Sequence, residues 1–184
     1  MSATLHADRA FDRQLRGASA RLTWLGVAMV VLGVAAIVFP MVSTLAVTLF
    51  VGWSLLLFGA LSLAFSFSIV GAGPFFGALL FSLASIAVGI FLLFNPAAGA
   101  VSLTLLAGLI FVLQGAFETF FAFETRPNSG WVAMLISAIA SIVLAVVIFS
   151  GWPQISGIVL GILFGVNFIS SGLGYIFVSR ALKS

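Results

Sequence analysis

Three polar side chains interrupt the apolar segments of this chain, and they are its candidates for chemistry: Gln114, Glu118 and Asn167. Glu118 is the sole charged residue between positions 22 and 123. An ionisable group inside an apolar segment is costly there and is by default a candidate functional residue. Gln114 lies four residues earlier, so on a helix it shares a face with Glu118. The two side chains bond to each other only if their rotamers converge.

Two interpretations of Glu118 are open from the sequence. If its carboxyl group faces the interior of a helical bundle, it is a protonatable group that would respond to acidification. If it lies close enough to the end of its helix, it reaches the headgroups or pairs with Arg126 and has no further role. A proton-coupled pump is disfavoured, because a relay needs a second ionisable group at depth and the sequence offers none.

Other kinds of chemistry are excluded by the residue inventory. The chain has no cysteine and a single histidine, His6, so we expect no disulfide and no metal site. It has no paired carboxylates, no Ser-His-Asp candidate, no phosphate loop and no HExxH motif. We therefore expect a protein that is not an enzyme, with no catalytic, cofactor-binding or metal-binding residues and no cofactor.

The composition indicates a membrane protein. The chain is 63% hydrophobic and only 6% charged, whereas a soluble domain carries roughly 25% charged residues. Its apolar segments reach or exceed the ~20 residues that cross a bilayer. Its net charge of +3 does not indicate nucleic acid, because the basic residues fall where membrane topology would place them.

Three prolines divide the apolar sequence into repeating units. Pro40, Pro96 and Pro153 are 56 and 57 residues apart, and each has glycines twelve and nineteen positions after it. Proline suits a helix start, because it lacks the N–H that would be unpaired there, and Asn95 adds a predicted N-cap. The sequence therefore predicts an all-α polytopic membrane protein with six transmembrane helices, arranged as three pseudo-repeated hairpins. The predicted helices are 22–39, 43–68, 75–95, 97–123, 131–150 and 154–178.

These helices form three predicted hairpins at 22–68, 75–123 and 131–178, within one transmembrane domain over 22–180. The segment 1–21 is basic and, if helical, amphipathic, so it either lies on anionic headgroups or forms a solvated leader. The basic residues all fall before the first helix, between the fourth and fifth, or after the sixth. Because positive charge favours the cytoplasmic side, we expect both termini to be cytoplasmic.

The glycines that follow the prolines recur on one helix face. Within each pair they are seven residues, or two turns, apart, and the helix before each proline carries small residues at the same spacing. Small residues allow the close backbone approach that joins helices in lipid. We therefore expect helix packing at these glycines, with the two faces of each hairpin able to meet, although a hinge or pore-lining role stays open. The glycines are Gly52, Gly59, Gly108, Gly115, Gly165 and Gly172.

With these features the chain resembles the HdeD family of small bacterial inner-membrane proteins. The stretches that carry the resemblance are LGVAAIVFP (32–40), GWSLLLFGALSL (52–63), VGIFLLFNP (88–96) and GLIFVLQGAFETFFAF (108–123). The resemblance implies acid-stress resistance, an inner (plasma) membrane location, no enzymatic activity and no cofactor. It carries over no catalytic residue, because the matching pattern is structural.

The leading hypothesis is accordingly a non-enzymatic, HdeD-like inner-membrane protein that contributes to acid-stress resistance through the membrane or a partner protein. A small channel or transporter is the alternative, since transporters often contain internal repeats, and a membrane scaffold or assembly subunit is a third. The expected partner is the lipid bilayer, with a membrane or periplasmic protein and a homo-oligomer left open and nucleic acid excluded.

Overall fold

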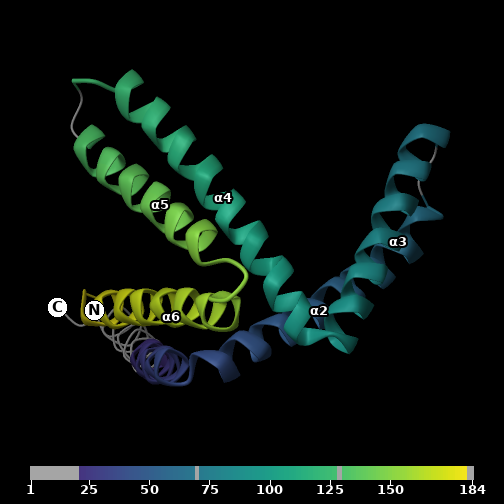
Figure 1. The fold of residues 1–184 in the computed structure, drawn as a ribbon, viewed down its shortest axis with the longest axis horizontal. Helices are drawn as coiled ribbons and strands as arrows, with labels where there is room; N and C mark the ends of the chain where they lie inside the picture. The colour runs from purple at the N-terminus through teal and green to yellow at the C-terminus, as the bar shows by residue number, and fades with distance from the viewer. Residues whose placement is uncertain (1–20, 69–70, 128–129, 182–184) are drawn as a thin grey trace, which may run out of the picture. The chain divides into compact units, whose positions relative to one another are not determined.

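The computed structural model describes residues 21–68, 71–127 and 130–181, and within them the chain is built of long helices (Figure 1). Six helices are long and apolar enough to cross a membrane in this part of the chain. They are the first helix Arg21–Val38, α2 Pro40–Ser66, α3 Ala72–Phe94, α4 Pro96–Glu124, α5 Trp131–Gly151 and α6 Ser156–Ala181. The predicted all-α fold with six spans is confirmed, and the predicted helix ends differ from these by at most three residues.

The chain divides into two compact units. One consists of Met1–Ser43 with Gly161–Ser184 and contains the first helix and most of α6. The other, Thr44–Leu160, contains most of α2 and all of α3, α4 and α5. The predicted amphipathic segment 1–21 lies almost wholly outside the described residues.

Two of the three prolines begin a helix, as predicted, and the third does not. Pro40 is the first residue of α2 and Pro96 the first of α4, whereas α6 begins only at Ser156, three residues after Pro153. Trp152 ends α5 in an extended conformation, with φ −71° and ψ 142°. The residue before a proline is driven out of the helical region by a clash with the proline ring. The third turn is therefore longer than the other two.

Asn95 caps α4 through its backbone and not through its side chain. Its φ of −131° and ψ of 62° break the helix between Phe94 and Pro96, and its side chain makes no cap hydrogen bond. The N–H of Gly99 donates to the carbonyl of Asn95 at 2.8 Å. The predicted side-chain cap was wrong, because the backbone alone starts the helix.

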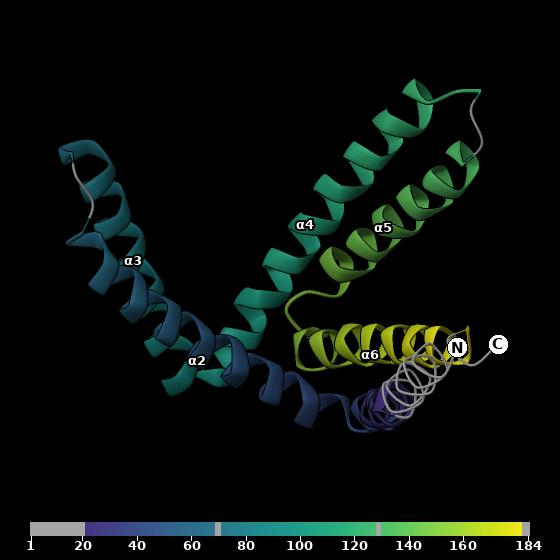
Figure 2. The same cartoon turned by 180° about the vertical axis from the view of Figure 1, so that it is seen from behind.

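In the first unit, the first helix packs on α6 with glycine facing glycine (Figure 2). A Cβ atom added at Gly172 would lie 2.6 Å from the carbonyl oxygen of Gly26, and one added at Gly165 would lie 2.8 Å from that of Gly33. No side chain fits at such distances, so the two backbones touch directly. Bare backbone contact of this kind is how small residues join helices in lipid.

In the second unit, the same kind of contact joins α2 to α3 and α4 to α5. A Cβ atom at Gly59 would lie 3.0 Å from the carbonyl oxygen of Ser82 on α3. One at Gly115 would lie 3.1 Å from that of Ala138 on α5. The buried residues of α4 and α5 include these same glycines and alanines.

The three contacts obey one register of the sequence repeat. Gly59, Gly115 and Gly172 occupy the same repeat position, and the residues opposite them are Ser82, Ala138 and Gly26, which are also 56 residues apart. The small-residue faces thus meet between α2 and α3, α4 and α5, and α6 and the first helix. They do not meet across the prolines within each predicted hairpin, which corrects our expectation that the two faces of one hairpin pair with each other.

A second set of contacts repeats near the helix ends that carry the prolines. Thr104 donates a long hydrogen bond, 3.5 Å, to the carbonyl of Ser156. The remaining two contacts use equivalent repeat positions and involve glycine: Gly99 against Thr48, and Gly161 against Ser43. The hydroxyl-bearing residues Thr48, Thr104 and Ser156 are almost fully buried, which extends the small-residue packing to these ends of the helices.

Candidate intramembrane polar site

The long helix α4 carries two polar side chains on one face. The amide Nε2 of Gln114 donates to Oε1 of Glu118 at 2.9 Å. The spacing of four residues places the two side chains one above the other, and their rotamers converge. Gln114 therefore acts as a direct clamp on the carboxyl group, which the spacing alone left undecided.

The second carboxyl oxygen of Glu118 has no partner. Oε2 is buried and makes no hydrogen bond, while the residue as a whole is half-buried. Burying an unpaired carboxylate charge costs far more than burying the neutral acid. The site is thus one carboxyl group held by one amide, with the remaining oxygen available to a donor.

Arg126 does not supply that donor. Its guanidinium carbon lies 3.9 Å from the centre of the Trp131 ring and 5.7 Å from that of Phe123. A guanidinium over an aromatic face is held by the ring's quadrupole. Within residues 21–68, 71–127 and 130–181, Glu118 forms no ion pair, so the alternative of an Arg126 partner does not describe the structure.

The third sequence candidate does not join this site. Asn167 lies on α6, and its side chain is exposed. It belongs to the first compact unit, whereas Gln114 and Glu118 belong to the second. The site therefore consists of two neighbouring residues on one helix.

A metal centre does not accompany this pair in the part of the chain that the structure describes. No group of three or more His, Asp, Glu or Cys side chains comes close enough there to hold an ion. The polar groups near the helix contacts are mostly hydroxyls that donate to their own helix. Thr48, for example, donates to the carbonyl of Thr44 at 2.9 Å, which satisfies a buried hydroxyl without any ligand.

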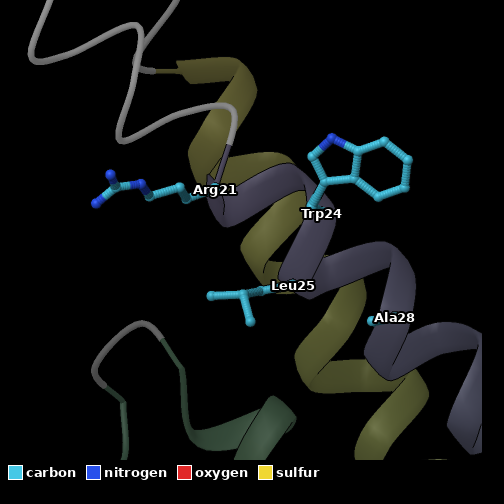
Figure 3. Close-up of a pocket in the computed structure, with 4 residues that line it drawn as sticks. All are labelled: Arg21, Trp24, Leu25 and Ala28. Atoms are coloured by element: carbon cyan, nitrogen blue, oxygen red, sulfur yellow. The ribbon is translucent and has the colours of Figure 1, made fainter.

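One surface feature was missed by the sequence reasoning. A pocket of about 610 Å³ lies along the first helix, lined by Arg21, Trp24, Leu25 and Ala28 (Figure 3). The signal was present in the spacing, since these four residues recur at the interval that forms one helix face. None of the three polar candidates lines this pocket.

The chain belongs to the family described as a short repeat of unknown function (DUF308), which matches residues 24–94 and again residues 80–150. Neither a curated protein nor a solved structure matches the chain. The two family matches start 56 residues apart, which is the spacing of Pro40 and Pro96. The internal repeat indicated by the prolines is thus the repeat of the family.

The family matches map onto the helix contacts. The first match runs through the first helix, α2 and α3, and the second through α3, α4 and α5. Each match contains one pair joined by a proline and one pair packed through glycine. α6 lies outside both matches, yet it packs on the first helix with the same register. The contact therefore occurs three times in a chain that the family matches twice.

Proposed function

We propose that this protein is a non-enzymatic bacterial inner-membrane protein of the HdeD type, which contributes to acid-stress resistance through the membrane or a partner protein. Its six apolar spans and its DUF308 repeats support a membrane role. The repeat is the family domain of HdeD-like proteins. The positions of the basic residues support an orientation with both termini in the cytoplasm.

The observation that carries the acid response is the Gln114–Glu118 pair. It places one titratable carboxyl group in a span with no other charge nearby in the sequence, bonded on one oxygen and unpaired on the other. Protonation changes such a group from an ion that needs a donor into a neutral acid that can itself donate. A drop in pH would thereby alter which partner, helix or lipid, this face of α4 accepts.

The test is acid survival of a deletion strain that expresses variants at equal levels. Glu118→Gln keeps the shape and the hydrogen-bonding capacity of the neutral acid, so survival should match the wild-type protein. Glu118→Lys places a cation beside the Gln114 amide, where no carboxylate faces it, so survival should fall towards that of the deletion. Glu124→Lys is the matched control, because Glu124 is exposed at the end of the same helix, and it should survive like the wild type.

The outcomes separate the protein from the residue. If deletion leaves acid survival unchanged, the proposed function fails. If deletion lowers survival but Glu118→Lys restores it as well as Glu124→Lys does, the function stands and Glu118 is not the responsive group. Reporter fusions at Lys183 and near Trp152 test the orientation, and we expect a cytoplasmic signal from the first and a periplasmic signal from the second.

A further inference from the structure

The outward face of the first helix carries an ordered sequence of side chains. Arg21, Trp24, Leu25 and Ala28 lie at positions i, i+3, i+4 and i+7, which places them on one face. All four are exposed and line the open pocket of about 610 Å³. In Figure 3, Arg21 and Leu25 project to one side of the helix and Trp24 and Ala28 to the other.

The chemistry of this face changes along the helix. A guanidinium stands at the end, a tryptophan that is 77% exposed and a leucine that is 56% exposed follow, and an alanine leaves space one turn deeper. Tryptophan is enriched where a bilayer's headgroups meet its hydrocarbon, and guanidinium binds phosphate in a bidentate manner. The face therefore matches a molecule with an anionic phosphate at one end and an acyl chain behind it.

A second guanidinium lies at the same end of the helix pair. The hydroxyls of Thr23 and Ser179 are hydrogen-bonded at 2.7 Å, so Arg180, which follows Ser179 on α6, is held next to the start of the first helix. One turn deeper, the direct backbone contact of Gly26 with Gly172 fixes the two helices. The pair thus presents two cations from a rigid base.

Neither arginine is neutralised by the protein in the described ranges. Arg21 and Arg180 are both exposed, and no ion pair involving either of them forms between residues 21 and 181 outside the gaps at 69–70 and 128–129. Arg126 differs, because its guanidinium lies over Trp131. The charge at this end is available to an external anion.

We propose that the paired ends of the first helix and α6 form a binding site for an anionic phospholipid. Arg21 and Arg180 hold the headgroup phosphate, and Trp24 and Leu25 line one acyl chain, for which Ala28 leaves room. A soluble anion has no use for the apolar part of this face, and a zwitterionic lipid gains little from two unpaired cations. The site is independent of Glu118 and of the proposed acid response.

The experiment uses the full chain, purified in a neutral detergent, with thermal unfolding followed as phosphatidylglycerol or phosphatidylcholine is added. A ligand that binds the folded state raises the unfolding temperature in proportion to its affinity and concentration. Phosphatidylglycerol should stabilise the protein more than phosphatidylcholine. Arg21→Gln and Arg180→Gln should each weaken the apparent affinity for phosphatidylglycerol about five-fold, the usual contribution of one basic residue at an anionic surface.

Arg126→Gln is the matched control, since it removes one exposed-end arginine that is engaged with an aromatic ring, and it should leave the affinity unchanged. Arg21→Lys should keep most of the preference, because the charge remains. The proposal is overturned if Arg126→Gln weakens binding as much as Arg21→Gln, if both lipids stabilise equally, or if inorganic phosphate stabilises as much as phosphatidylglycerol. Should Arg21→Gln fail to fold, Arg180→Gln decides between these outcomes.

Discussion

The contact between the first helix and α6 and the contact between α4 and α5 use the same repeat positions but different residues. In the first, glycine faces glycine, and the atom nearest to an added Cβ at Gly26 is a backbone oxygen at 2.6 Å. In the second, Gly115 faces Ala138, whose carbonyl oxygen lies 3.1 Å from the added Cβ. The backbones are therefore closer where both helices have lost their side chains.

This difference predicts how each contact tolerates change. A clash with backbone can be relieved only by moving a whole helix, whereas a clash with a side chain can be relieved by a new rotamer. At Gly108 the nearest atom is a methyl carbon of Ile148 at 3.0 Å, and no backbone atom is among the three nearest. We expect the first helix and α6 to be the less tolerant pair.

The largest effect is expected from Gly165→Leu. Its Cβ would lie 2.6 Å from Ile37 and 2.8 Å from the Gly33 carbonyl, so leucine must push the first helix away and should lower the free energy of unfolding by about 3 kcal/mol or more. Gly174→Leu on the same helix is the control, because nothing lies within 4 Å of its added Cβ. Thermal unfolding in detergent measures both, and equal stability of the two variants would remove the packing account of α6.

A smaller effect, which ranks the two contacts directly, is expected from alanine at equivalent positions. Gly172→Ala meets the Gly26 carbonyl at 2.6 Å, and Gly115→Ala meets an isoleucine side chain at 2.6 Å but the Ala138 carbonyl only at 3.1 Å. The losses should be about 2 and about 1 kcal/mol respectively. The comparison is wrong if Gly115→Ala destabilises the protein more than Gly172→Ala.

The smallest effect is expected from Gly108→Ala. The contact with Ile148 requires a shift of a few tenths of an ångström, and alanine favours the helix by up to about 1 kcal/mol over glycine. The two contributions oppose each other, so the unfolding temperature should change little. A loss as large as that of Gly172→Ala would show that α4 is as tightly held as α6.

Much of the fold could be predicted from the sequence, because the signals are local. Length and apolar composition define the spans, and Pro40 and Pro96 begin helices wherever they follow a turn. Pro153 follows Trp152, which is held extended, and the helix start is displaced to Ser156. A one-residue insertion in the third repeat was the visible trace of this difference.

The partner of each helix could not be predicted from the sequence. A glycine face offers a close approach but does not specify which other face it meets, since the contact is largely bare backbone. The pairing of α6 with the first helix joins residues more than 140 positions apart, such as Gly26 and Gly172. Likewise, the bond between Gln114 and Glu118 depends on rotamers, and spacing alone does not determine them.

The pairing of the first helix with α6 is the central claim, and one crosslinking measurement tests it. The chain contains no cysteine, so Thr23→Cys with Ser179→Cys gives a pair without background. The hydroxyl oxygens of these residues are 2.7 Å apart, close to the distance that a disulfide spans between its sulfur atoms, about 2.05 Å. Oxidation in membranes should crosslink the double variant nearly completely and neither single variant within one chain. A double variant that stays reduced under these conditions would contradict the pairing.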